Sequence, residues 1–274
     1  MNATFSSDGY EIDEQLFSPE EVADLRDHYM AMRLAGTYPG DDDAGRTATD
    51  PLKKFPRLIQ MHHHDDRSMA WLLDPRLTGR IQALTGTEPL AVQTMLYFKP
   101  AGARGQALHQ DNFYLKVKDS TCIAAWLALD DCDEENGCMR VVPGSADLPI
   151  LCITAADTAT SFTDITVPIP EGMEVRPVLM RAGDVLFFNG SLIHGSYPNE
   201  SRGRFRRALI GHYMLGDGQA IGEWYRPLYD IHGNEVEVAV NPGGSKCGVW
   251  VDAPSGPTVT LVETDDRNRA SLRE

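Results

Sequence analysis

After residue 88 the sequence becomes a series of short apolar or alternating runs, and this change most constrains the fold. Glycine, proline, asparagine and aspartate separate the runs, as they commonly separate β-strands. Because helical patterns precede these runs and do not alternate with them, the order predicts a helical cover on a β-sandwich or barrel, not an alternating βαβ sheet. The runs are Ala91–Phe98, Cys122–Leu129, Met139–Val142, Val175–Met180, Val185–Phe188 and Ala208–Met214.

Two N-terminal segments carry helix signals. Ser18 can serve as N-cap of the first helix, Pro19 suits its first turn, and Glu21 occupies the capping-box position. The apolar stripe of this helix is Val22, Leu25, Tyr29 and Met32. The second helix is expected to begin at Asp74-Pro75 and end at Gly86, with an inward face of Leu77, Ile81 and Leu84.

Charge and length limit the class of protein. The 274 residues carry 25 basic and 40 acidic side chains, a net charge of −15. Nucleic acid and anionic membranes are therefore poor partners. The start of the chain lacks the basic and apolar regions of a secretory signal, and no apolar run is long enough to span a bilayer. These features predict a cytoplasmic protein without a membrane segment, and a homodimer stays open.

Five cysteines are few, odd in number and spread along the chain: Cys122, Cys132, Cys138, Cys152 and Cys247. This usage argues against a disulfide framework and for a reducing compartment. Five residues separate Cys132 from Cys138 and no C-x-x-C pair accompanies them, which argues against a structural zinc site.

The triplet His109-Gln110-Asp111 and the later His194 form a candidate metal site. On an extended segment residues i and i+2 point the same way, so His109 and Asp111 can bind one ion while Gln110 faces elsewhere. His194 follows the Gly183-Asp184 turn and the apolar strand after it. Two imidazoles and a carboxylate are the ligand set of non-haem iron(II) sites that keep open positions. A zinc hydrolase and a non-catalytic metabolite-binding jelly roll are alternatives.

An arginine cluster, Arg202, Arg204, Arg206 and Arg207, follows His194. An inward arginine could hold the remote carboxylate of a dicarboxylate whose other end chelates the metal. Because side chains alternate along a strand, Arg206 and Arg207 cannot both face the interior. Arg206 is the preferred inward residue, Arg204 and Arg207 are substitutes, and the other arginines are expected on the surface.

Several ordered segments resemble the phytanoyl-CoA dioxygenase superfamily of iron(II)- and 2-oxoglutarate-dependent oxygenases. They lie between about residue 90 and 215, and the N-terminal helices show a weaker likeness. The segments are His109-Gln-Asp-Asn-Phe-Tyr-Leu115, Trp126-Leu-Ala-Leu-Asp-Asp131, Asn136-Gly-Cys-Met-Arg-Val-Val-Pro-Gly-Ser145, Gly183-Asp184, His194-Gly-Ser196 and Phe205-Arg206. The likeness implies a double-stranded β-helix, or jelly roll, with buttressing N-terminal helices.

The resemblance also assigns site residues. It implies that iron(II) is held by His109, Asp111 and His194, and that 2-oxoglutarate is held by Arg206, with Ser196 and Trp126 beside it. Arg206 lies one position later after the distal histidine than the family pattern leads us to expect. Weaker candidates for the co-substrate pocket are Gln93, Asn112 and Tyr97.

The reaction implied by the resemblance consumes O2 and 2-oxoglutarate, releases succinate and CO2, and oxidises a substrate, with hydroxylation as the default outcome. Relatives that halogenate replace the carboxylate ligand with a small residue, so Asp111 argues against halogenation. The segment around His109 looks most similar to bacterial kanamycin B dioxygenase and aminophosphonate hydroxylase types. A small polar metabolite or natural-product intermediate is the expected substrate, and an acidic chain disfavours the phosphates of an acyl-CoA.

We expect one domain over residues 1–274, with a helical cover at about 1–88, a β-helix core at about 89–216, and C-terminal loops and an edge strand at 217–274. Residues 147–173 lack periodicity and lie between the two metal-binding segments, which predicts a lid over the site. The tract His62-His63-His64 is interpreted as a surface or substrate-pocket loop, Asp130–Asn136 as a solvated hairpin, and His212 as a packed core histidine.

Overall fold

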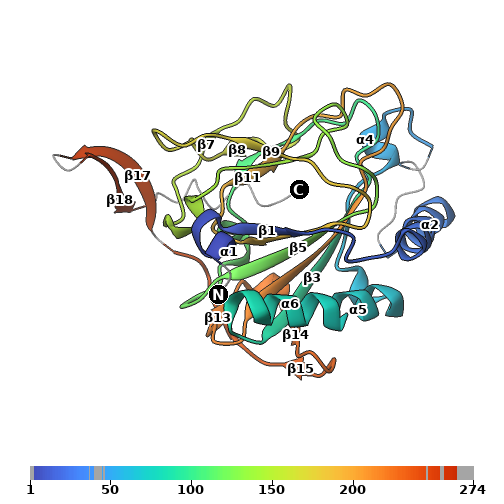
Figure 1. The fold of residues 1–274 in the computed structure, drawn as a ribbon, viewed down its shortest axis with the longest axis horizontal. Helices are drawn as coiled ribbons and strands as arrows, with labels where there is room; N and C mark the ends of the chain where they lie inside the picture. The colour runs from blue at the N-terminus through green and yellow to red at the C-terminus, as the bar shows by residue number, and fades with distance from the viewer. Residues whose placement is uncertain are drawn as a thin grey trace.

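The computed structural model describes residues 3–36, 38–39, 45, 47–244, 246–253 and 256–263. Two antiparallel sheets lie one above the other (Figure 1). The larger sheet has the order β1-β10-β5-β12-β3-β14-β15, with β2 also pairing with β3, and the smaller has the order β4-β11-β6-β9. Strands that are distant in sequence become neighbours in both sheets. The arrangement is a double-stranded β-helix, as the sequence predicts.

The strands of the larger sheet are β1 (Tyr10–Asp13), β2 (Leu58–Ile59), β3 (Pro89–Tyr97), β5 (Cys122–Ala128), β10 (Val185–Asn189), β12 (Ala208–Leu215), β14 (Leu228–Tyr229) and β15 (Glu235–Val236). Those of the smaller sheet are β4 (Gln106–His109), β6 (Met139–Val141), β9 (Arg176–Val178) and β11 (His194–Ser196). Each apolar run predicted as a strand contains one, and the ends differ by a few residues. Short strand pairs lie outside the two sheets: β7 (Thr154–Ala155) with β8 (Ile165–Thr166), and β13 (Ala220–Ile221) with β16 (Ala239–Val240).

Both predicted helices form. Helix α2 (Pro19–Ala35) has the expected capping box, because Glu21 N donates to Ser18 Oγ at 3.2 Å and Ser18 N donates to Glu21 Oε2 at 2.8 Å. Helix α6 (Pro75–Thr85) ends at Gly86, whose φ of 79° suits glycine. The other helices are α1 (Ala3–Asp8), α4 (Pro51–Lys54), α5 (Asp66–Leu72) and α7 (Asp111–Leu115), with 3-10 turns η1 (Met61–His63), η2 (Ser145–Asp147) and η3 (Glu223–Tyr225).

Helices α5 and α6 lie against the outer face of the larger sheet (Figure 1). Their buried side chains pack with those that β5 and β12 direct outward, including Leu127 and Leu209. Burying each such leucine contributes about 1.5–3 kcal/mol. The opposite faces of the same strands form a second apolar cluster between the sheets, with Trp126, Phe188 and Ile210. One sheet face therefore supports the helices, and the other faces the space between the sheets.

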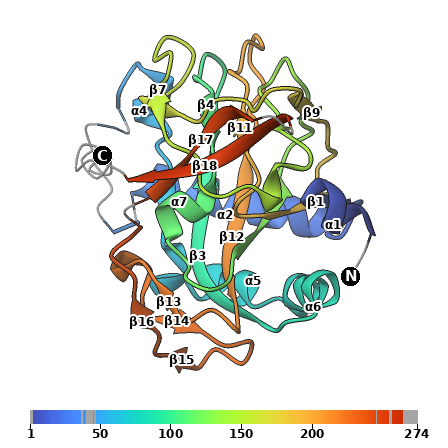
Figure 2. The same cartoon turned by 90° about the vertical axis from the view of Figure 1, so that its left-hand side faces the viewer.

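The C-terminal region contains the expected edge strand, β15, and also a hairpin that the sequence did not lead us to expect. Strands β14 and β15 extend the larger sheet. Strands β17 (Lys246–Ala253) and β18 (Gly256–Glu263) pair with each other as a hairpin outside the two sheets. The hairpin extends from one side of the molecule in Figure 1, and Figure 2 faces that side. The alternating apolar residues of this hairpin, such as Val249 and Val251, are a strand signal that the glycine- and proline-rich context obscures.

Although the cysteine usage argues against a disulfide framework, one pair of cysteines is bonded. Cys152 and Cys247 form a disulfide across 95 residues of sequence, and Cys122, Cys132 and Cys138 are free and buried. A main-chain bridge between Leu151 and Gly248 brings the two cysteines together. Pairing between segments so distant in sequence depends on the fold and leaves no mark in cysteine spacing. The inference of a reducing compartment loses this support.

A helix that crosses a bilayer must be both long and apolar. No helix in the described part of the chain is long and apolar enough to cross a membrane.

Candidate metal and co-substrate site

The backbone brings the three candidate ligands together. His109 ends β4, and His194 begins β11 directly opposite it in the antiparallel ladder. Asp111 is the first residue of α7, so the triplet is not one extended segment as the sequence reasoning assumed. Gln110 between them is nevertheless extended, with φ −121° and ψ 123°, and its side chain points away to bond Leu151 N and Ser191 O.

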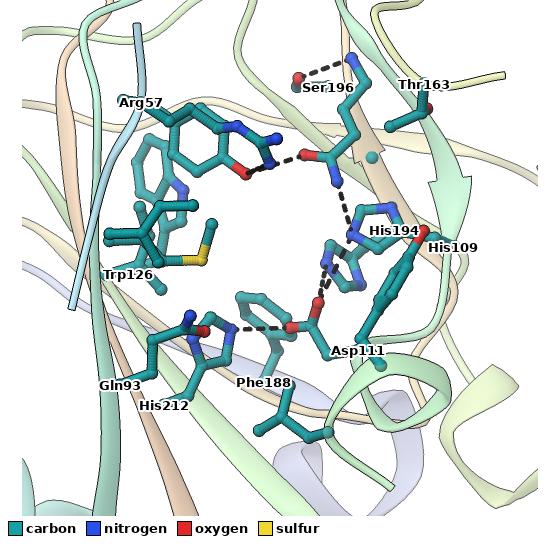
Figure 3. Close-up of a pocket in the computed structure, with 18 of the residues that line it drawn as sticks. Arg57, Gln93, His109, Asp111, Trp126, Thr163, Phe188, His194, Ser196 and His212 are labelled. Carbon is teal, nitrogen blue, oxygen red and sulfur yellow. Dashed lines mark hydrogen bonds and ion pairs between the residues drawn. The ribbon is translucent and has the colours of Figure 1, made fainter. Parts of the chain in front are cut away.

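The ligand atoms of the three side chains face one another (Figure 3). Asp111 Oδ1 lies 3.4 Å from His109 Nε2 and 3.5 Å from His194 Nε2, and all three ligand atoms lie within 4.8 Å of one another. Each residue is less than 9% exposed. Gly195, between His194 and Ser196, allows this close packing, because a Cβ there would lie 2.7 Å from Gln106 O.

The strands also set which nitrogen of each histidine faces the other ligands. His109 Nδ1 lies 2.9 Å from Ala107 O, and His194 Nδ1 lies 2.9 Å from Leu192 O. Because a carbonyl only accepts, both Nδ1 atoms carry the proton and both Nε2 lone pairs point into the site. Burial and the neighbouring His109 lower the pKa of His194 to about 4, so its imidazole is neutral at pH 7.

Asp111 is held ionised by its neighbours. Burial by itself would raise the pKa of this carboxyl, but His194 and His212 beside it hold the pKa well below the usual range. The result is two imidazoles that present their Nε2 atoms and one carboxylate, all converging on one point. This donor set is that of a divalent transition metal with open coordination positions.

His212 is a site residue that the sequence reasoning missed. We expected a packed core histidine, and the residue is indeed buried, but its Nε2 lies 3.2 Å from Asp111 Oδ2 and its ring lines the cavity. Because the carboxylate accepts, Nε2 carries the proton, and Nδ1 has no partner among the described residues. The signal was available: on β12, alternation from Arg206 places Ile210 and His212 on the same face.

The structure shows which of the three candidate arginines faces the interior. Arg206 is 2% exposed, lies over the Trp126 ring at 5.1 Å and lines the cavity. Its Nε donates to Gly137 O at 3.0 Å, and its Nη1 is buried without a partner among the described residues. Arg204 instead pairs with Asp133 and Glu135, and Arg207 with Asp130.

The candidate site opens into a cavity of about 840 Å³ between the two sheets. Its lining includes five of the predicted co-substrate residues: Gln93, Tyr97, Trp126, Ser196 and Arg206. Asn112 is absent from the lining, and its Oδ1 accepts from Val117 N at 3.2 Å. That candidate therefore holds the turn after α7 and does not face the cavity. Several cavity residues had no sequence signal that we recognised: Arg57, Tyr114, Glu223, Trp224 and Tyr225.

Part of the 147–173 insertion reaches the cavity. Thr163 and Asp164, just before β8, and Ile165, its first residue, belong to the cavity lining (Figure 3 shows Thr163). The predicted position over the site is therefore correct for this part of the insertion, and a lid movement remains a prediction.

The two other unusual segments lie elsewhere. His62 is buried, and both its backbone N–H and its ring Nδ1 lie at Thr94 Oγ1, whereas His63 and His64 are exposed. The expected surface position therefore holds for two of the three histidines, and none of them belongs to the cavity lining. The acidic segment forms the predicted turn, but two of its carboxylates, Asp130 and Asp133, pair with Arg207 and Arg204. These pairs engage Arg204 and Arg207 outside the cavity lining.

Comparisons with known proteins agree with this geometry. The family model for phytanoyl-CoA dioxygenase (PhyH) matches residues 5–208. Phytanoyl-CoA dioxygenase 1 of Oryza sativa subsp. japonica is 29% identical over 181 residues, 65% of this chain and 63% of the relative. Peroxisomal phytanoyl-CoA dioxygenase of Rattus norvegicus is 25% identical over 250 residues, 86% of this chain and 73% of the relative. The match thus spans less than two thirds of the rice protein.

Solved structures show the same fold at low identity. The epimerase SnoN from nogalamycin biosynthesis, in complex with Fe3+, α-ketoglutarate and nogalamycin RO, is 23% identical with a TM-score of 0.62, over 82% of this chain and 84% of its own. EctD from S. alaskensis, with 2-oxoglutarate and 5-hydroxyectoine, is 22% identical with a TM-score of 0.63, over 88% of this chain and 86% of its own. The chain belongs to the phytanoyl-CoA dioxygenase family, whose members are 2-oxoglutarate-dependent, non-haem iron dioxygenases.

Proposed function

We propose that this chain is a dioxygenase that hydroxylates a small polar metabolite or natural-product intermediate, using iron(II), 2-oxoglutarate and O2. The observation that carries the proposal is the convergence of His109, Asp111 and His194 at one end of a cavity that also contains Arg206. When bound, the metal and the keto acid supply the oxidising chemistry: 2-oxoglutarate and O2 become succinate and CO2, and one oxygen atom enters the substrate.

The residues present fit such a metal. The Nε2 atoms of His109 and His194 and a carboxylate oxygen of Asp111 would hold it, because all three face the same point with the correct protonation. His212 would keep Asp111 oriented through its second oxygen. The surrounding protein excludes bulk water, since all four side chains are buried.

The residues also fit the co-substrate. Arg206 is a buried guanidinium without a carboxylate partner in the described structure, so an anion in the cavity would offset the cost of its burial. We propose that Arg206 binds the remote carboxylate of 2-oxoglutarate and that Ser196 adds a hydrogen bond. Trp126, Gln93 and Tyr97 would line the sides of this subsite.

The rest of the cavity supports a polar substrate of modest size. Tyr114, Trp224 and Tyr225 contribute aromatic surface, and Thr163, Asp164 and Glu223 contribute hydrogen-bonding groups. Aromatic faces combined with a few polar groups suit a small ring-containing or hydroxyl-bearing molecule. The carboxylates of Asp164 and Glu223 disfavour the phosphates of an acyl-CoA at this position, as does the net charge of −15.

Anaerobic titration with iron(II) and then 2-oxoglutarate tests the proposal. A weak visible charge-transfer band is expected only when the keto acid chelates iron. We expect Arg206→Ala to weaken 2-oxoglutarate binding on the order of a hundredfold, because the buried remote carboxylate of 2-oxoglutarate loses its charged partner. Arg204→Ala, at a salt-bridged surface position, is the matched control and should bind normally. No band, with full activity on zinc, would favour the hydrolase alternative.

Substrate identity is approached by screening metabolites for succinate formation that depends on the added compound. The cytoplasmic location, the homodimer and the single-domain division stay predictions from the sequence. Size-exclusion chromatography with light scattering tests the homodimer directly.

A further inference from the structure

Lys99 is a buried cation beside the candidate co-substrate subsite. It follows β3 and is 6% exposed. Its ammonium group donates to Ser196 Oγ at 2.8 Å, to Gly137 O at 3.2 Å and to Tyr197 O. Burial and the nearby Arg206 lower the pKa of Lys99, and no carboxylate pairs with it among the described residues. The three oxygen acceptors offset this by taking all three N–H bonds of the charged form. Removing an ammonium group from water costs free energy, so the burial of Lys99 needs a compensating role.

The contacts of Ser196 determine which way its hydroxyl donates. Its Oγ accepts from Lys99 Nζ at 2.8 Å and from Gln106 N at 3.2 Å. A serine hydroxyl has two acceptor lone pairs and one donor hydrogen. Both lone pairs are engaged, so the remaining capacity of Ser196 is its O–H donor, and Ser196 lines the cavity whereas Lys99 does not.

Lys99 and Arg206 also share an acceptor. Gly137 O accepts from Lys99 Nζ at 3.2 Å and from Arg206 Nε at 3.0 Å. Gly137 has φ of 85°, and a Cβ there would lie 2.6 Å from Tyr197 O, so only glycine fits between these contacts. The two cations are thus held in one hydrogen-bonded unit with Ser196.

We propose that Lys99 is a positioning residue that commits Ser196 to donate a hydrogen bond to the remote carboxylate of the keto-acid co-substrate. The inference rests on the proposed function and extends it to a residue outside the cavity. In this arrangement Lys99 never touches the keto acid. It acts by engaging a lone pair of Ser196 and by adding positive charge behind Arg206, and both effects favour a dicarboxylic keto acid over a monocarboxylic one.

The test compares two keto acids on the anaerobic iron(II)-loaded protein. 2-Oxoglutarate has the remote carboxylate, and 2-oxopentanoate has the same carbon chain without it. We expect Lys99→Met to weaken 2-oxoglutarate binding about tenfold to a hundredfold, the range for a hydrogen bond to a charged group. Binding of 2-oxopentanoate should change less than about twofold, because it makes no contact with Ser196 through a remote carboxylate. Lys118→Met, at an exposed lysine, is the matched control and should bind both as the wild type does.

A double-mutant cycle distinguishes positioning from general support of the fold. If Lys99 acts through Ser196, Lys99→Met should have little further effect on 2-oxoglutarate binding in a Ser196→Ala background. Lys99→Gln, which is neutral but keeps N–H donors, should recover part of the affinity. Because a buried lysine can be needed for folding, the thermal unfolding midpoint of each variant is measured first, and Lys99→Gln replaces Lys99→Met if the latter does not fold.

The inference would be overturned by equal weakening of the binding of both keto acids or by additive losses in the cycle. Unchanged 2-oxoglutarate binding in both Lys99 variants would do the same. Failure of the wild-type protein to bind 2-oxoglutarate would instead overturn the proposed function.

Discussion

Each candidate ligand depends on a neighbour that is not a ligand. The carbonyls of Ala107 and Leu192 set the tautomers of His109 and His194, and His212 bonds the second oxygen of Asp111. These contacts fix the orientation of groups that would otherwise rotate about their side-chain bonds. At the residue scale, the site is therefore a set of three ligands and a surrounding layer that holds them.

The contact between His212 and Asp111 gives a prediction about metal affinity. His212→Ala should weaken iron(II) binding about tenfold to a hundredfold, because Asp111 loses the donor that orients it. His212→Gln keeps an N–H at a similar position and should lose less. Competition against a chromophoric chelator measures both, with His232→Ala, at an exposed turn, as the control. Wild-type affinity in His212→Ala would show that Asp111 needs no such support.

At the element scale, α2 and α6 are joined by charged side chains as well as by their apolar faces. Arg76, in the first turn of α6, donates to both carboxylate oxygens of Glu21 in α2, at 2.8 and 3.1 Å. Glu21 also completes the capping box of its own helix. One carboxylate therefore serves a helix end and a helix–helix contact. These helices cover the outer face of the sheet whose inner face lines the cavity.

We expect the ion pair between Glu21 and Arg76 to make a pH-dependent contribution to the stability of the fold. The bonds from Arg76 and from Ser18 N lower the pKa of Glu21 to about 2, below its usual value of 4.5. The native state therefore favours ionised Glu21, so the contribution is complete above pH 4.5 and is lost as pH falls toward 2. Glu21→Gln keeps the capping box and should lower the free energy of unfolding at pH 7 by up to about 1 kcal/mol.

Urea unfolding of both proteins at pH 7 and near pH 3 measures this difference, which should shrink at the lower pH. Glu20→Gln, at an exposed position in the same helical turn, is the control. A difference that stays constant with pH would show that the carboxylate charge is not its source.

At the scale of the whole molecule, the C-terminal hairpin is tied to the insertion that reaches the cavity. Besides the disulfide, Cys152 N donates to Gly248 O at 2.9 Å and Gly248 N donates to Ile150 O at 2.8 Å. The same insertion carries Thr163–Ile165 to the cavity lining. The β17–β18 hairpin therefore anchors the first part of a long segment whose middle part reaches the cavity.

Removing the disulfide should destabilise the molecule. Cys152→Ser is expected to lower the free energy of unfolding by about 2–4 kcal/mol, because the unfolded chain regains the freedom of a long closed loop. Wild-type protein treated with a reductant should match the variant, and the variant itself should not respond to the reductant. Peptide mapping without reduction should recover the Cys152–Cys247 linkage. Its absence, together with a wild type unaffected by reductant, would contradict the pairing.

The sequence by itself determined the features that depend on local order. The capping box at Ser18, the glycine end of α6, the strand runs, the triplet around His109 and the inward register of Arg206 all follow from patterns within a few residues, because helix caps and strand alternation are short-range. The residue types of the metal ligands and the resemblance to the family were also evident from the sequence.

Only the tertiary structure decided what distant segments do to one another. It paired Cys152 with Cys247, placed His212 on Asp111, moved Asn112 out of the cavity and brought Lys99 to Ser196 across 97 residues. Such contacts arise where two sheets and a long insertion meet, and the sequence around each of these residues gives no sign of its distant partner. The physical reason is that a hydrogen bond or disulfide across the fold depends on packing geometry, which spacing along the chain does not encode.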